Sequence, residues 1–435
     1  MRVSERYGDT RPDEVRGETP VAVLTAVQQQ YEVLPYPPRD PERELEELRQ
    51  PSLAELPRIL EAIWGGRRRL DGEFRVLDAG CGTGDNTIFL AEQLRHAGGQ
   101  VVALDFSSTS LEIARRRAEL RGLQNIRFVQ ASLEDVAALD IGPFDFIITP
   151  GVLHHLESPH AGLVALRTVL KPDGGLGVMV YARYGREPVY EMQALLRYLA
   201  PAALPPAERL RILRSTLAAL PKDHRALRPL VDQPHFHGEI QSDAGAYDLL
   251  LHTQDRPYTV PEVYEWLEGA GLELREFSIP RRYEPSTYAQ DGRVARLPAA
   301  ERHAVAELMH GAMRKHEFYA APASAPPPPT VEAGERSAAP VWCTWGFGEM
   351  LAPALERPGN QLRFSFGEER DVLLGGDALT RRLLGAVDGE RSVAAILETG
   401  LGVPGRPSPS AVVRKWTEVA TALRDVGALA LHLSA

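Results

Sequence analysis

Cysteine is scarce in this sequence, which has only Cys81 and Cys343 among its 435 residues. Cys81 lies inside a glycine-rich segment where a disulfide partner would disrupt the turn, so the sequence excludes a disulfide-stabilised secreted domain. Long apolar runs are lacking as well, because the start of the chain is polar and runs such as residues 176–182 are too short to cross a bilayer. We therefore expect a cytoplasmic protein without a signal peptide, a membrane anchor or a membrane partner.

Positive charge is in deficit, since 49 Lys and Arg residues face 59 Asp and Glu residues, which gives a net charge of -10. This charge would repel a nucleic-acid backbone unless the basic residues gathered on one face. The densest basic run, Arg67 to Arg69, is typical of a solvated connection. We therefore expect no nucleic-acid partner. Arginine greatly outnumbers lysine, a bias typical of a GC-rich bacterial genome.

The length and the average composition, with 44% hydrophobic and 25% charged residues, predict a folded protein of two or three domains. The patterns along the chain divide it into an N-terminal arm with two helices (19–32 and 52–64), a βα core, a helical cap, the completion of the core, an Ala/Pro-rich linker and a C-terminal domain. The corresponding residues are 1–73, 74–181, 182–256, 257–319, 320–340 and 341–435.

The βα core shows the clearest pattern, because short β-rich runs alternate with amphipathic segments. The expected strands are residues 75–79, 101–105, 126–130, 144–149 and 177–181, and the helices are 86–96, 108–121 and 159–169. This alternation predicts a parallel sheet with a doubly wound α/β fold.

The alternation of strands and helices ends after residue 181, because the patterns of residues 189–199 and 206–219 both predict helices with no strand between them. These helices predict a cap, after which a helix at 260–269 and a sixth strand at 272–279 complete the core. Residues 341–347 read as another strand, and the pattern leaves open whether it is the seventh, antiparallel strand of a mostly parallel sheet or part of the C-terminal domain. That domain is expected to be a small α+β unit with a strand at 362–366 and helices at 377–387, 392–399 and 410–426.

A glycine-rich loop, Gly80-Cys81-Gly82-Thr83-Gly84, joins the first strand to its helix. Glycines there let a ligand approach the backbone closely, and the helix start at Asn86 presents unbonded N–H groups. The spacing differs from the G-x-G-x-x-G of pyrophosphate-binding loops, which disfavours a NAD-dependent oxidoreductase. Asp78 and Asp105 end the first two strands, where an open sheet places its ligand, and a carboxylate at Asp105 can accept two ribose hydroxyls.

These motifs resemble the class I, Rossmann-like SAM-dependent methyltransferases in four places: residues 78–84, Asp105, residues 144–156 and residues 170–175. The resemblance implies SAM as cofactor and S-adenosylhomocysteine (SAH) as product. Members of the family commonly place an acid beside the adenine after the third strand, whereas this chain has Ala131, Ser132 and Leu133 there, so Ser132 and Leu133 become the expected adenine contacts. The expected cofactor-binding residues are Tyr31, Tyr36, Asp78, Gly80, Cys81, Gly82, Gly84, Asn86, Asp105, Phe106, Ser132, Leu133 and Gly151.

Tyr31 and Tyr36 belong to a segment, residues 30–37, that is similar to an N-terminal arm of some bacterial members. There it would lie over bound SAM and exclude water. The alternative, that the two tyrosines only pack against the domain, stays open.

Methyl transfer to oxygen or nitrogen needs a group that removes the acceptor's proton, and histidine suits this role near neutral pH. The candidates are His154 and His155 after the fourth strand, with His252 and Tyr258 near the end of the cap; packing is the alternative for the two neighbouring histidines. His235, His237 and His252 could form a metal site, but their alternation also suits a strand or loop, and we expect no metal.

Residues 383–393 resemble winged-helix modules that bind peptides. The alternative roles for the C-terminal domain are dimerisation or simple capping of the enzyme, so a homodimer is a possible partner arrangement. We expect a methyltransferase acting on N or O of a small metabolite or a peptide or protein acceptor. The alternative from another class is a SAM- or SAH-binding regulatory protein without turnover.

Overall fold

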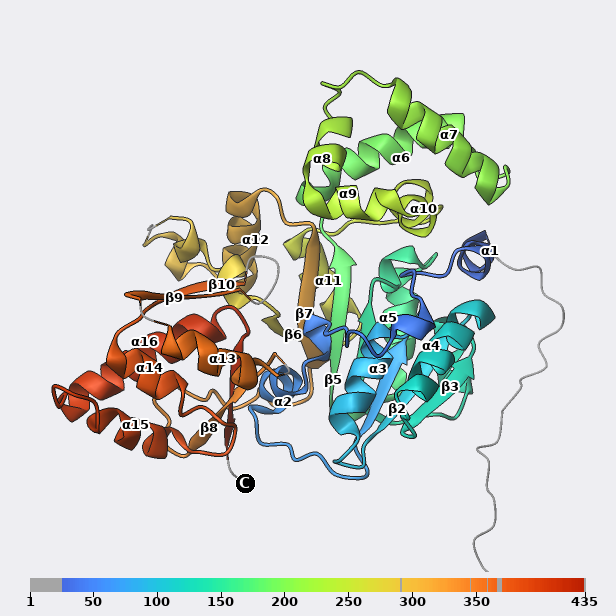
Figure 1. The fold of residues 1–435 in the computed structure, drawn as a ribbon. Coiled ribbons are helices and arrows are strands. Elements are labelled where there is room, and N and C mark those ends of the chain that lie inside the picture. Colours follow the sequence, from blue (N-terminus) through green and yellow to red (C-terminus); the bar gives the residue numbers. More distant parts are fainter. Residues whose placement is uncertain (1–25, 290–291, 345, 358, 366–369, 434–435) are drawn as a thin grey trace, which may run out of the picture.

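The computed structural model describes residues 26–433, apart from 290–291, 345, 358 and 366–369. Within these residues, seven strands form one sheet in the order β3-β2-β1-β4-β5-β7-β6 (Figure 1). Strands β1 to β5 pair in parallel, whereas β7 runs antiparallel between β5 and β6. The strands are β1 (Arg75–Ala79), β2 (Gln100–Asp105), β3 (Ile126–Gln130), β4 (Phe144–Pro150), β5 (Leu170–Tyr181), β6 (Leu272–Phe277) and β7 (Lys315–Pro322). The expected mostly parallel seven-stranded sheet is confirmed.

Helices cover both faces of this sheet. One face packs against α5 (Pro159–Thr168) and α11 (Val260–Gly269), and the other against α2 (Leu56–Trp64) and α3 (Asp85–Leu94). Helix α4 (Ser108–Leu120) lies beside α3, and α12 (Ala299–His310) lies beside α11. Local signals start these helices: the side chains of Ser107, Ser158 and Thr259 accept backbone N–H bonds at the first turns of α4, α5 and α11. The central strand β4 is buried on both faces, as its apolar run predicts.

The seventh strand is not the one that the sequence left open. The described residues of 341–347 do not join the main sheet; instead β8 (Ala338–Trp342) pairs antiparallel with β11 (Leu429–Leu433). The seventh strand is β7, whose alternating residues His316 and Phe318 are buried against β5 and β6. Its apolar end, Ala320 to Pro322, continues into the Ala/Pro-rich segment, and this composition hid the strand in the sequence.

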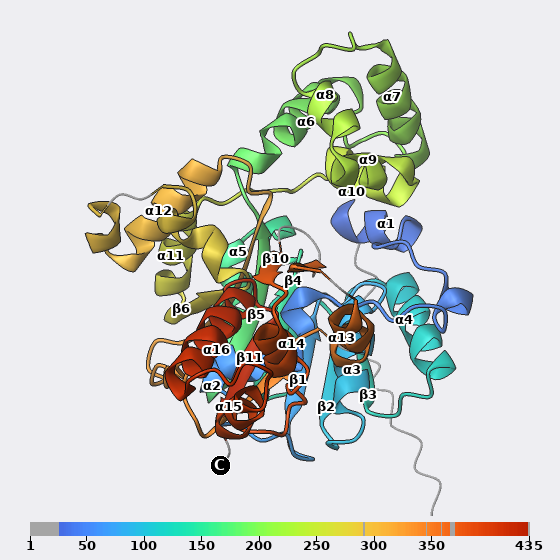
Figure 2. The same ribbon diagram turned by 60° about the vertical axis from the view of Figure 1, so that its left-hand side comes forward.

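Five helices of the cap stand over the carboxyl ends of the strands (Figures 1 and 2). They are α6 (Glu187–Leu199), α7 (Pro206–Ala219), α8 (Leu227–Asp232), α9 (Pro234–Gln241) and α10 (Asp243–Leu251), and they share a hydrophobic core of their own. Helix α1 (Ala26–Val33) lies between the cap and α4 in both views. The helix expected at 19–32 is thus described only from residue 26, because residues 19–25 lie outside the described part. Leu34, just after α1, packs on the cap core.

The C-terminal part has a separate hydrophobic core around the buried Trp416. Its further elements are α13 (Phe347–Glu356), β9 (Gln361–Ser365), β10 (Asp371–Gly375), α14 (Ala378–Leu384), α15 (Val393–Leu401) and α16 (Pro409–Arg424). Strand β10, paired with β9, was not expected from the sequence, and Phe366 lies outside the described residues. The winged-helix resemblance stays a prediction.

The segment 320–340 is not a plain spacer, since Val331 and Ala333 are buried in this C-terminal core and Trp416 Nε1 donates to the Ala333 carbonyl at 2.6 Å. The C-terminal part also docks on α2, because Glu61 of α2 accepts bonds from Leu431 N (3.2 Å) and Arg424 Nη2 (2.9 Å). Among the described helices, none is both long and apolar enough to span a membrane.

Candidate functional site

A cavity of about 1780 Å³ opens at the carboxyl ends of the parallel strands, below the cap. This is the place where an open α/β sheet binds its ligand. Most of the expected cofactor-binding residues line it: Tyr31, Tyr36, Gly80, Cys81, Gly82, Asn86, Asp105, Phe106, Ser132, Leu133 and Gly151. Asp78 and Gly84 are not among the lining residues.

The glycine loop is tied to the end of β2. Gly80 N and Cys81 N donate to the Leu104 carbonyl at 2.8 and 3.0 Å, and Gly82 N donates to Asp105 Oδ2 at 2.8 Å. Asp105 Oδ1 accepts from Ser107 N at 2.8 Å. Each carboxylate oxygen therefore keeps acceptor capacity for a ligand. Burial raises the pKa of Asp105 to about 6, against the backbone hydrogen bonds that lower it.

Asp78 is fully buried beneath the loop. Thr87 Oγ1 donates to its Oδ2 at 2.6 Å, while Oδ1 has no hydrogen-bond partner among the described residues. Burial raises the pKa of Asp78 to about 7. A buried carboxyl group with one free oxygen can accept from an ammonium group or a water that reaches it.

Gly82 and Gly84 both need positive φ angles, +51° and +94°. A Cβ on Gly82 would lie 2.5 Å from the Tyr36 carbonyl oxygen, so glycine lets the arm lie directly on the loop. At Gly84 the nearest atom would be Ala114 Cβ, at 2.8 Å, so this glycine permits α3 to pack on α4.

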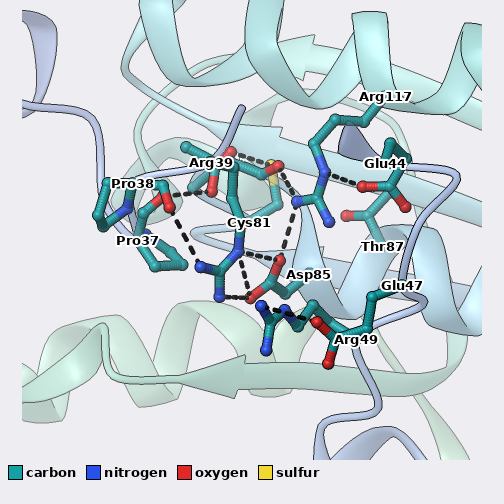
Figure 3. A network of polar contacts seen from close by, with 12 residues as sticks. Pro37, Pro38, Arg39, Glu44, Glu47, Arg49, Cys81, Asp85, Thr87 and Arg117 are labelled. Carbon is teal, nitrogen blue, oxygen red and sulfur yellow. Dashed lines mark hydrogen bonds and ion pairs between the residues drawn. The ribbon is translucent and has the colours of Figure 1, made fainter. Parts of the chain in front are cut away.

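A network of ion pairs fastens the arm across the start of α3 (Figure 3). Thr83 Oγ1 donates to the Pro37 carbonyl at 2.8 Å, and Arg39 binds both oxygens of Asp85. Arg117, itself buried, donates to Asp85 Oδ1 (2.8 Å) and to Glu44 (2.5 Å). This network was not predicted from the sequence, since its members are far apart along the chain.

Glu32 is a second attachment of the arm. Its carboxylate accepts from Ser108 N, Thr109 N and Thr109 Oγ1 at the N-terminus of α4, at 2.8, 3.1 and 2.7 Å. These hydrogen bonds lower the pKa of Glu32 despite its partial burial. Negative charge at a helix N-terminus is favourable, so α1, which contains Tyr31, and the following Tyr36 are held beside the cavity.

His155 and His252 form a stacked pair at the boundary of the core and the cap, with ring centroids 3.8 Å apart. Their Nδ1 atoms bind the same residue: His155 Nδ1 lies 2.7 Å from the Gln254 carbonyl oxygen, and His252 Nδ1 accepts from Gln254 N at 3.1 Å. Because a carbonyl oxygen only accepts, His155 carries its hydrogen on Nδ1 and keeps a lone pair on Nε2. His252 in its neutral form carries its hydrogen on Nε2.

Tyr31 links this pair to the cap. Its hydroxyl donates to Asp248 Oδ1 at 2.9 Å and lies 3.4 Å from His252 Nε2. Burial raises the pKa of Asp248 and lowers the pKa of His252. Tyr31 therefore lines the cavity and also packs against the cap, and an arm that covers bound SAM stays a prediction.

The other two catalytic candidates lie in the core. His154 is 1% exposed between His155 and Tyr181, and burial lowers its pKa far below the usual value. Tyr258 is 1% exposed and stacks on Trp266, with centroids 5.1 Å apart. Neither residue lines the cavity, whereas His155 does.

Two groups among the described residues bring possible metal ligands within 4.8 Å of one another, and neither includes His235 or His237. One group is His155, Asp248 and His252. Because Gln254 N–H donates to His252 Nδ1, the Nε2 that faces Asp248 carries a hydrogen and offers no lone pair. This arrangement suits a hydrogen-bond network better than a metal.

Part of the chain is similar to known methyltransferases. Residues 76–174 match a family model described as "Methyltransferase domain". An uncharacterised protein of Synechococcus sp. is 34% identical over 271 residues, which are 59% of this chain and 62% of that protein. The tRNA 5-carboxymethoxyuridine methyltransferase of Escherichia coli is 36% identical over 114 residues, or 26% of this chain and 42% of that enzyme. The chain thus spans less than two thirds of the length of these relatives.

A solved structure of PKMT2 from Rickettsia typhi has a similar fold, with a TM-score of 0.63, 14% identity, and coverage of 88% of this chain and 75% of that one. A second structure of PKMT2, in complex with AdoHcy, gives a TM-score of 0.61 at 13% identity, with coverage of 89% and 76%. The fold and the loop define a class I, Rossmann-like α/β protein. Within this fold, residues 76–174 are similar to methyltransferase domains.

Proposed function

We propose that this chain binds SAM in the large cavity and transfers its methyl group to an oxygen or nitrogen of a small-molecule or peptide acceptor. The observation that carries the proposal is that one cavity is lined both by the glycine loop with Asp105 and by His155, whose Nε2 keeps a lone pair.

The residues of the loop fit the cofactor. Asp105 accepts the two ribose hydroxyls with the lone pairs that Gly82 and Ser107 leave free. The free Oδ1 of Asp78 attracts the ammonium group, directly or through water. Ser132 and Leu133 border the adenine. Bound SAM supplies an electrophilic methyl group.

His155 is the residue that we assign to proton removal. Its Nδ1–H bond to Gln254 holds the ring in one tautomer and orientation, which leaves Nε2 to accept a proton from the acceptor's O–H or N–H group. Residues of the arm and the cap, among them Tyr31 and Asp248, line this end of the cavity, and in this proposal they shield a bound acceptor from water.

The net charge of the chain, -10, disfavours a polyanionic acceptor such as a nucleic acid. This supports a small-molecule or peptide acceptor. The experiment must also include tRNA, because the E. coli relative is named as a tRNA methyltransferase.

The test begins with calorimetry of the purified chain with SAH and with NADH. We expect SAH to bind and NADH not to bind. Label transfer from methyl-labelled SAM is then measured with small hydroxy and amino compounds, peptides and bulk tRNA. Binding of NADH alone would contradict the proposal, and SAH binding without transfer to any acceptor would favour a regulatory protein. Preferred labelling of tRNA would make the acceptor class wrong.

A further inference from the structure

Arg186 is a buried cation in the cavity wall, outside the part of the wall that we assign to SAM. It ends the short helical turn Tyr184–Arg186 after β5 and is 3% exposed. Its guanidinium carbon lies 3.4 Å from the centroid of the Tyr181 ring, so the flat group stacks on that ring. Both residues line the cavity. Arg186 lies beyond residues 76–174, which match the methyltransferase-domain model. The motifs of that domain therefore do not predict a role for it.

Two of its donors are unused. Nε and Nη2 of Arg186 have no hydrogen-bond partner among the described residues. The nearest carboxylate in an ion pair is Asp255, whose Oδ2 lies 3.8 Å from Nη2, too far for a hydrogen bond, and this oxygen already accepts from Gln193 Nε2 at 3.0 Å. A buried guanidinium with open N–H groups is costly unless a ligand supplies the acceptor atoms.

The charge around this end of the cavity favours an anion. The cap and the surfaces beyond β5 contribute more cations than carboxylates to the lining, namely Arg186, Arg282, Arg314, Lys315 and Arg370 against Glu239, Asp248 and Glu317. Asp255 and Glu55, which do not line the cavity, lie beside Arg186 and Arg370 and offset two of these cations. The glycine-loop half differs, since five carboxylates face two arginines there: Asp85, Asp105, Glu134, Asp135 and Glu157 against Arg115 and Arg127.

Arg186 and His155 flank the same aromatic ring. The centroid of Tyr181 lies 5.9 Å from that of His155, and Arg186 covers the ring at 3.4 Å. A compact molecule can therefore reach Arg186 with one end while its other end faces His155.

We propose that the acceptor is a carboxylic acid whose carboxylate binds the open Nε and Nη2 donors of Arg186 while its hydroxyl or amino group faces His155. This inference rests on the proposed function, because it assigns the acceptor of the same cavity. A planar guanidinium pairs with a carboxylate through two parallel hydrogen bonds, a geometry that a lysine cannot reproduce.

The test uses the full chain saturated with SAH and probes that differ only in charge. Benzoate and phenylacetate are titrated against benzamide and phenylacetamide, with binding followed by ligand-observed NMR. We expect each carboxylate to bind on the order of tenfold more tightly than its amide. Arg186→Gln should remove this difference in affinity. Arg186→Lys keeps the charge but loses the two parallel N–H donors, so it should retain only part of the difference.

Arg183→Gln is the matched control, because Arg183 is half-exposed, pairs with Glu262 and does not line the cavity. It should preserve the preference for carboxylates. A thermal melt and the SAH affinity of each variant separate loss of folding from loss of the anion site, and Arg186→Lys supplies the comparison if Arg186→Gln does not fold.

The outcomes are distinct. Equal binding of carboxylate and amide by the wild type, or binding of neither, makes the proposal wrong. A strong loss of SAH affinity in both Arg186 variants also overturns it, because the arginine would then bind the cofactor's own carboxylate. Failure of the wild type to bind SAH at all would contradict the proposed function instead.

Discussion

His155 and His252 stack with 25° between their ring planes, and the peptide groups of Gln254 hold their Nδ1 atoms in opposite protonation states. One ring therefore has a lone pair on Nε2, and the other has a hydrogen there. The hydrogen of His252 points toward the hydroxyl of Tyr31, which in turn donates to Asp248. The two histidines differ in what they can do although their rings are in contact.

From this difference, His155→Gln should lower kcat by about 10² to 10⁴, the usual contribution of a general base, with little effect on SAH affinity. His252→Gln should cost less, because His252 only orients its neighbours. Label transfer and SAH calorimetry on both variants measure this. A full kcat in His155→Gln would show that the acceptor needs no base from this residue.

Asp105→Asn should weaken SAH binding by tenfold or more, because each hydrogen bond to a charged group contributes about 1.5 to 3 kcal/mol. The pKa of about 6 adds a pH dependence: below that pH the carboxylate of the free protein is protonated, so the affinity of the wild type should rise from pH 5 to pH 7. Calorimetry across this range should show a flatter profile for Asp105→Asn. Glu119→Gln, on the outer surface of α4, is the control. The same pH profile in wild type and Asp105→Asn would assign the titration to another group.

Asp78→Asn should stabilise the ligand-free chain at pH 8 while it weakens SAH binding. The folded-state pKa of Asp78, about 7, is above the ordinary value of 3.8, so the folded state binds more protons between these values and its stability falls as pH rises through this range. The asparagine does not ionise, so its advantage should be absent near pH 4 and should reach about a few kcal/mol above pH 7. Urea unfolding at pH 5 and pH 8 measures it. An advantage of equal size at both pH values would contradict the cause that we give.

Gly82→Ala should abolish SAH binding and displace the arm, because the new Cβ would lie 2.5 Å from the Tyr36 carbonyl oxygen at a φ of +51°. Limited proteolysis between residues 26 and 50 should become faster. Gly238→Ala is the matched control, since a Cβ there meets nothing within 4 Å, and it should behave as the wild type. Normal SAH affinity in Gly82→Ala would mean that the arm contact is not needed.

Glu32→Gln tests the other attachment of the arm. The amide has no charge and one acceptor oxygen instead of two, so the bonds to the start of α4 weaken and SAH should dissociate several-fold faster. Stopped-flow displacement of SAH measures the rate, with the exposed Glu46→Gln as control. An unchanged rate would show that the arm does not close the site.

The sequence by itself determined the parallel core and its glycine loop, because period-2 and period-3.6 patterns, helix caps and glycines with positive φ are local properties. It placed Asp78 and Asp105 at strand ends for the same reason. It did not reveal β7, since the apolar end of this strand merges with an Ala/Pro-rich segment and only pairing with β5 and β6 defines it.

Only the tertiary structure decided which polar residues share the cavity. Arg39 meets Asp85 and Arg117 meets Glu44 across more than forty residues of sequence, and Gln254 selects between His155 and His154 through a hydrogen bond made a hundred residues away. Burial then separates the candidates, because it encloses His154 and Tyr258 in the core and leaves His155 and Arg186 on the cavity wall. Such contacts depend on how the cap and the arm fold onto the sheet, and no spacing along the chain encodes them.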